Sequence, residues 1–140
     1  VQTCALPISD LEKSLPRKLR GWGVPNTVFV VVRDNDGTDC KALKRQLVEV
    51  CSQNGRPDTL VRIVCQELEA WYFGDMEAVA EAYGKPNLAN RQGERRFRNP
   101  DAIQSPSREM KRLVPEFEKI AGAKHIAPHM TLEKNRSTSF

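Results

Sequence analysis

The sequence lacks several features that define well-known protein classes. No apolar stretch approaches the length of a membrane span, and the eight glycines are scattered, with no Gly-Lys-Ser or Gly-Lys-Thr phosphate loop. No Cys-x-x-Cys pair and no Gly-x-Ser-x-Gly motif occur. The sequence therefore gives no support for a membrane span, a P-loop nucleotide hydrolase, a thiolate zinc site or a serine hydrolase.

Disulfide chemistry is not indicated either. Apart from Cys4, the cysteines are Cys40, Cys51 and Cys65, an odd number, each in an apolar setting. We expect buried, reduced thiols, no membrane association and a cytoplasmic location. The 140 residues are 39% hydrophobic and 29% charged, which is typical of a globular protein. The net charge of +4 permits an anionic partner such as nucleic acid but does not require one.

One short apolar segment carries most of the information about the fold. Residues 27–32 are β-branched or aromatic and do not alternate with polar residues, which predicts a strand over residues 27–34 that is buried on both faces, as in a parallel sheet. Asp34 and Asp36 follow it. Ligands of open α/β sheets bind at the carboxyl ends of such strands, and residues two apart on an extended chain point the same way. The two carboxylates suit a hard cation such as Mg²⁺.

The same residues also suit a plain turn. Asp-Asn-Asp-Gly is favourable turn sequence, and a strand has to end somewhere. From the residues alone, both the turn and the metal site remain open.

A strand–helix–strand unit extends the prediction. Residues 38–53 have helical periodicity and end at Asn54-Gly55, and residues 60–65 form a second strand. The order predicts a right-handed crossover with parallel strands. Glu67 and Glu69 follow the second strand, so two more acids reach the edge of the sheet that carries the aspartates.

The C-terminal half is expected to be mainly helical. Asp75 and Gly84 bound one predicted helix, and Ser105-Pro106 and Gly122 bound a second helical region that is broken at Pro115.

A basic cluster lies between those helices. Arg95, Arg96 and Arg98 surround Phe97, a pattern that suits contact with a nucleic-acid backbone, although a solvated surface is the more frequent explanation of such a run.

The first eight residues match the translation of a sequencing-adapter oligonucleotide. We therefore expect residues 1–9 to be an artefactual or disordered tail, and residues 10–140 to be a single domain, truncated at both ends and lacking its first strand.

Four segments together resemble one protein family. They are 32–40, 67–75, 97–103 and 135–140, which include Asp-Asn-Asp-Gly, Glu-Ala-Trp-Tyr-Phe-Gly-Asp, Phe-Arg-Asn-Pro-Asp-Ala-Ile and Asn-Arg-Ser-Thr-Ser-Phe. In order and spacing they are similar to the bacterial DUF4276 family. The resemblance covers nearly all of the chain after Ser9. That family is similar to TOPRIM domains, so a TOPRIM-like (Rossmann-like) parallel α/β sheet flanked by helices is implied.

The resemblance also implies a function. Asp34 and Asp36 match the TOPRIM Asp-x-Asp pair that holds Mg²⁺ or Mn²⁺, and Glu69 is implied as a further catalytic residue. The parent protein would be a metal-dependent nuclease, with Arg95, Arg96 and Arg98 on the nucleic acid, and the partner of an ATPase in phage defence. The TOPRIM Glu of an earlier strand has no counterpart here, so this fragment is expected to be inactive. A non-catalytic module that regulates a partner ATPase is the alternative.

Overall fold

The computed structural model describes residues 8–140, which form two compact units. The α/β unit comprises residues 39–63 and the described residues up to Arg33, and the helical unit comprises Asp34–Thr38 and Val64–Phe140. Within the described residues, no helix combines the length and apolar character that crossing a membrane requires. The predicted tail lies outside the described residues except for its last two positions, which begin a helix. The predicted single domain over 10–140 stays a prediction.

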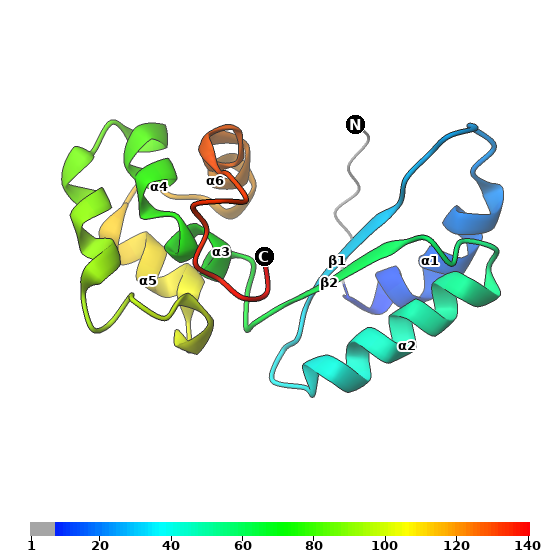
Figure 1. The fold of residues 1–140 in the computed structure, drawn as a ribbon. Helices are drawn as coiled ribbons and strands as arrows, with labels where there is room; N and C mark the ends of the chain where they lie inside the picture. The colour runs from blue at the N-terminus through cyan, green and yellow to red at the C-terminus, as the bar shows by residue number, and fades with distance from the viewer. Residues whose placement is uncertain (1–7) are drawn as a thin grey trace. The chain divides into compact units, whose positions relative to one another are not determined.

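The α/β unit contains two helices and a two-stranded sheet: α1 (Ile8–Gly21), β1 (Val30–Asp34), α2 (Cys40–Gln53) and β2 (Leu60–Val64). The strands are parallel, because Leu60 N donates to Phe29 O at one end and Asn35 N donates to Val64 O at the other. Figure 1 shows β1 and β2 side by side with α2 as the crossover. The predicted strand–helix–strand unit is confirmed.

Both helices of this unit pack on one face of the sheet. Leu19, Leu47 and Val31 form a shared core with the residues of β2 that point the same way. Val28 and Val30, on the other face, are 73% and 57% exposed. The prediction of a strand buried on both faces is therefore wrong, because within the described residues α1 and α2 cover the same side (Figure 1).

Two further details of this unit differ from the sequence predictions. Asp39, rather than Thr38, caps α2, and its Oδ1 accepts from Ala42 N at 2.8 Å. The cysteine thiols are not uniformly buried, since Cys51 is in the core of this unit, whereas Cys40 is half-buried, as is Cys65 in the helical unit.

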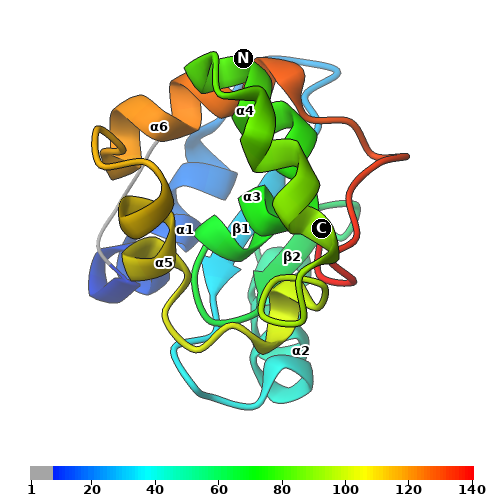
Figure 2. The same cartoon turned by 90° about the vertical axis from the view of Figure 1, so that its left-hand side faces the viewer.

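The helical unit is built from short helices. They are α3 (Glu69–Gly74), α4 (Met76–Tyr83), α5 (Pro106–Leu113) and α6 (Lys119–Ile126), with the 3₁₀ segments η1 (Pro86–Gly93), η2 (Pro100–Ala102) and η3 (Ala127–His129). Figure 2 shows α3 next to α4 and α5, both of which it contacts. The mixed α/β class and the mainly helical C-terminal half are confirmed. The core of this unit contains Phe73, Met76, Val79, Phe97, Met110, Val114 and Ile126.

Gly122 does not end a helix as predicted. It lies inside α6, where a Cβ would come within 2.3 Å of the Phe117 ring. The absence of a side chain at Gly122 lets α6 approach Phe117 closely, so this glycine serves packing rather than termination.

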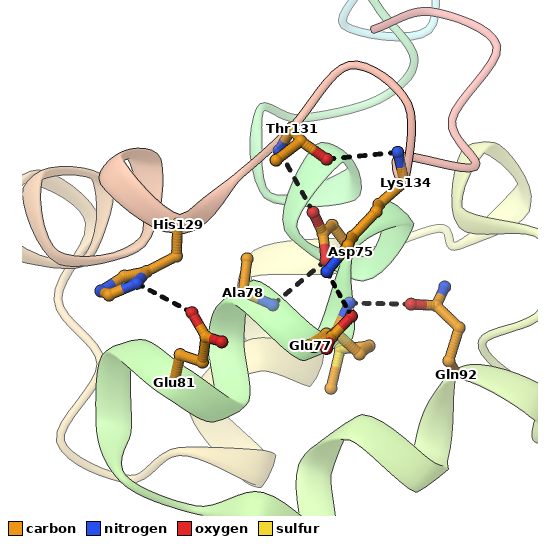
Figure 3. A network of polar contacts seen from close by, with 9 residues as sticks. Asp75, Glu77, Ala78, Glu81, Gln92, His129, Thr131 and Lys134 are labelled. Carbon is orange, nitrogen blue, oxygen red and sulfur yellow. Dashed lines mark hydrogen bonds and ion pairs between the residues drawn. The ribbon is translucent and has the colours of Figure 1, made fainter.

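The helix boundaries around α4 agree with the sequence. Asp75 Oδ1 accepts from Ala78 N at 3.1 Å at the start of α4, and Gly84 adopts a left-handed φ of 60° at its end. Figure 3 shows that the second carboxylate oxygen of Asp75 accepts from Thr131 N. In the same figure His129 pairs with Glu81, and Lys134 approaches Glu77. Asp75 and these two pairs tie the segment after α6 to α4.

The last six residues are held against α3 and η2. Asn135 Nδ2 donates to Trp71 O at 2.9 Å, and its Oδ1 accepts from Ser137 N. Asp101 accepts from the hydroxyls of Ser137 and Thr138, both at 2.6 Å. Three of the segments that carry the family resemblance therefore meet in this unit.

Candidate acidic site after the two strands

The loop after β1 is sharply bent. Thr38 donates to Asn35 O through both its backbone N and its Oγ1, at 2.8 and 2.5 Å. Asp36 has a φ of 47° and Gly37 a φ of 77°. The turn interpretation is therefore confirmed. The extended geometry that would align Asp34 with Asp36 ends before Asp36, since that residue is in the left-handed region.

Asn35 joins this loop to the residues that follow β2. It is buried, its backbone N donates to Val64 O at 3.0 Å, and its side-chain Oδ1 accepts from Gln66 N at 2.7 Å. Its Nδ2 donates to Thr38 O at 3.2 Å. The amide acceptor thus links the two loops, while the amide donor forms a bond within the first loop. This bond between the loops holds the one that carries Asp34 and Asp36 next to Gln66, which precedes Glu67 and Glu69.

Glu67 and Glu69 enter from the second loop. Glu67 Oε2 accepts from Ser107 N at 2.8 Å, which satisfies a free N–H in the first turn of α5. Glu69 is the first residue of α3 and is only 4% exposed. A buried carboxylate needs compensation, so the surroundings of Glu69 decide its charge.

Lys119 is the cation of this cluster. Its Nζ lies 3.9 Å from Glu69 Oε1 and 4.0 Å from Glu67 Oε1, and its side chain is 64% exposed. No sequence signal pointed to this residue, because fifty residues separate it from Glu69 and no local pattern links them. The four acids Asp34, Asp36, Glu67 and Glu69 are called the acidic cluster below.

The electrostatics show that the acidic cluster is not fully compensated. Burial raises the pKa of Asp34 to about 6, helped by the charges of Glu69 and Asp36, while Lys119 opposes the shift. Burial also raises the pKa of Glu69, against its own backbone N–H and Lys119. Tyr72 responds to the same field, since burial and then the charge of Glu69 raise the pKa of its hydroxyl. An added cation would relieve this repulsion.

The donor chemistry suits a hard cation, but a ready-made cage is not present. Among residues 8–140, no three or more His, Cys, Asp or Glu side chains are placed so that they could hold a metal ion. Mg²⁺ is commonly held by one or two carboxylates together with water and phosphate. The predicted pair of Asp34 and Asp36 has the chemistry of that smaller donor set, and it stays a prediction because Asp36 does not continue the extended strand.

The predicted nucleic-acid contacts lie in a different part of the helical unit. Arg96 pairs with Glu109, and Arg95 and Arg98 are exposed. Phe97 is fully buried and stacks on Phe73 with 5.0 Å between ring centroids. Its ring is therefore part of the core rather than a platform for a base. The three arginines as nucleic-acid ligands stay a prediction.

Fold and geometry together define a mixed α/β protein with an acidic cluster at the ends of two parallel strands. The chain belongs to the family described as a domain of unknown function (DUF4276), which it matches over residues 2–140. The family predicted from the four sequence segments is confirmed. Searches of curated proteins and of solved structures each found no match.

Proposed function

We propose that this chain is the TOPRIM-like part of a Mg²⁺-dependent nuclease that acts on phosphodiesters. The observation that supports the proposal most is the Asn35 bridge, which holds the loop after β1 to the loop after β2. Acids that follow two different strands thereby act on one another, as the raised pKa of Asp34 indicates. Carboxylates with uncompensated mutual repulsion in a partly buried place are typical of functional sites.

The acids of the cluster and Lys119 would have separate roles in the reaction. Asp34 and Asp36 would hold Mg²⁺ or Mn²⁺, which polarises a phosphate and activates water when it is bound. Glu69, whose pKa burial raises, would accept a proton from that water. Lys119 would neutralise part of the negative charge beside the phosphate, since its ammonium already lies at this cluster.

A second function rests on a different observation. Lys119 pairs with Glu67 and Glu69, and Glu67 also satisfies α5, so these two acids have structural partners. In a non-catalytic module that regulates a partner ATPase, these structural contacts would be the whole role of Glu67 and Glu69. The two proposals differ at the exposed Asp36, which would hold a metal ion in the nuclease and would need no ligand in the regulatory module.

Cleavage assays on the full-length natural protein separate the proposals. With the full-length protein we expect cleavage of DNA or RNA that depends on Mg²⁺ or Mn²⁺. Asp34→Asn should lower it at least 100-fold.

The exposed Asp58 of the α/β unit provides a matched control. Asp58→Asn should leave cleavage unchanged. Equal rates in Asp34→Asn and the wild type would refute the assignment of the site and favour the regulatory module.

A further inference from the structure

Charge is distributed unevenly between the two units. The α/β unit, over residues 1–33 and 39–63, holds ten of the 22 Lys and Arg residues but five of the 18 Asp and Glu residues. Its net charge is therefore +5, whereas the helical unit carries −1. The modest net charge of the whole chain hides a strongly basic unit.

The basic side chains of α1 lie opposite its buried stripe. Leu15 and Leu19 are in the core of the α/β unit. At 100° per residue, Lys13, Arg17 and Arg20 fall on the far side of the helix, and all three are exposed. Their charged ends point away from the sheet.

The second helix repeats this arrangement. Leu43 and Leu47 are buried, while Lys41, Lys44 and Arg45 are exposed. These three basic residues line a shallow depression on the outer side of α2, together with Val48 and Glu49.

Because α1 and α2 contact each other and cover the same face of the sheet, their outer sides form one surface (Figure 1). We call it the basic helical face: Lys13, Arg17, Arg20, Lys41, Lys44 and Arg45.

The acids of the α/β unit number five against ten cations. Glu12 pairs with Arg33 at 2.5 Å, and Asp39 is engaged as the cap of α2. Glu49 accepts from Gln53 at 2.6 Å. Hydrogen bonds to neutral donors leave the charges of Asp39 and Glu49 in place, so the positive field rests on the excess of cations, a net +5 for the unit.

We propose that the basic helical face binds the phosphate backbone of a nucleic-acid duplex without reading its sequence. Six cations spread over two adjacent helices match a repeating array of phosphates. A membrane surface is disfavoured, because the apolar sides of both helices are buried in the core and are not free to insert between lipids. In the Arg95–Arg98 segment, by contrast, Arg96 is already paired with Glu109.

The inference shares its partner class with the proposed nuclease but uses a different unit of the chain. Binding needs no metal, so it can be measured in EDTA, where no divalent-dependent cleavage occurs. Asp34→Asn should bind the duplex as the wild type does. Loss of cleavage and loss of binding can therefore be told apart.

The test is fluorescence anisotropy with a labelled 20-base-pair DNA duplex and the 140-residue chain in EDTA. Two triple variants, Lys13→Gln/Arg17→Gln/Arg20→Gln and Lys41→Gln/Lys44→Gln/Arg45→Gln, should each weaken binding at least tenfold. Each should also reduce the slope of log affinity against log salt by about 2 to 3, since each phosphate contact contributes about 0.9.

A matched variant in the helical unit controls for total charge. Arg108→Gln/Lys124→Gln/Arg136→Gln removes three exposed cations outside the Arg95–Arg98 segment and should change affinity less than twofold. The proposal is overturned if this control weakens binding as much as the α1 and α2 variants do, or if the wild type does not bind at 50 mM salt. Tighter binding to anionic vesicles, or equal competition by polyglutamate, would also overturn it in favour of a lipid or an acidic protein.

A second measurement uses the wild type alone, so its result does not depend on whether a variant folds. Lysine acetylation of the wild type, read by mass spectrometry, should be reduced by the duplex at Lys13, Lys41 and Lys44. Lys124, exposed in the helical unit, should be modified equally with and without the duplex. Equal protection at all four lysines would contradict a specific role for the basic helical face.

Discussion

The two units differ in where they place polar groups, although both expose some large apolar side chains, such as Ile120 and Leu132 in the helical unit. In the α/β unit, large apolar side chains such as Val28, Val30 and Leu60 are exposed, and the core is apolar. In the helical unit, polar side chains go inside. Every buried polar or charged residue found in the described part of the chain belongs to it: Asn35, Glu69, Asp75, Glu109 and Ser137.

The difference indicates where the chemistry lies. Burying a polar group costs free energy unless it is hydrogen-bonded, so each buried polar residue of the helical unit has a specific partner and a specific place. The α/β unit instead presents a basic surface and an apolar sheet face. We infer that the helical unit holds the site and that the α/β unit provides surfaces for contact.

The largest expected effect is at Gly74 in the helical unit. A Cβ there would lie 2.0 Å from Asn135 Oδ1, so Gly74→Ala displaces the amide that holds the C-terminal segment. We expect a loss of about 3 kcal/mol in the free energy of unfolding, as for a severe steric overlap. Urea denaturation measures it. Gly93→Ala, with no atom within 4 Å of the new Cβ, should cost less than about 1 kcal/mol.

The Asn35 bridge comes next. Asn35→Ala leaves Gln66 N without its acceptor, and we expect a loss of about 2 kcal/mol in unfolding free energy. Asn35→Asp keeps an acceptor for Gln66 N but cannot donate to Thr38 O and adds a buried negative charge to the acidic cluster, so it should also destabilise the chain. Asn90→Ala at an exposed site is the control. Equal stability of Asn35→Ala and the wild type would show that the bridge does not hold the two loops.

Asp101 gives a pH-dependent effect. Burial raises its pKa, but hydrogen bonds from Ser137, Thr138 and Ser139 outweigh burial and hold the pKa below the ordinary 3.8. Its stabilisation is therefore fully present above pH 4 and is lost as the pH falls through its folded-state pKa. Asp101→Asn should cost about 1 kcal/mol at pH 7 and nothing in strong acid. Thermal unfolding across that range tests this; a cost that does not vary with pH would contradict it.

The smallest expected effect is a gain in the free energy of unfolding rather than a loss. Because the pKa of Asp34 is raised from 3.8 to about 6, the folded chain binds more protons between those values, and stability falls as the pH rises through that window. Asp34→Asn should therefore stabilise the chain above pH 6, by about 1 kcal/mol after solvent screening. The gain should disappear below pH 4. A destabilised Asp34→Asn at pH 8 would show that the carboxylate is compensated by the fold.

Local signals in the sequence gave part of the structure correctly. Apolar periodicity located the parallel strand–helix–strand unit, and capping residues such as Asp75 and Gly84 located the ends of α4. These features depend on neighbours within a few residues. The uncovered sheet face could not be predicted, because an apolar strand has the same sequence whether one face or both are covered.

The candidate site was only partly predictable for the same reason. Asp34, Asp36 and Glu69 were identified from their positions after strands. The left-handed conformation of Asp36 and the role of Asn35 depend on hydrogen bonds across the two loops. Lys119 reaches Glu69 from a helix far along the chain, and charge alone does not distinguish it from the other lysines.

The most direct test of the central claim, that Asp34 and Asp36 form a cation site, is a Mn²⁺ titration of the 140-residue chain by isothermal calorimetry at pH 7.5. We predict that the wild type binds Mn²⁺ and that Asp34→Asn and Asp36→Asn lose this binding, while Asp58→Asn retains it. Absence of heat from the wild type at millimolar Mn²⁺, or equal binding by Asp34→Asn, would contradict the account.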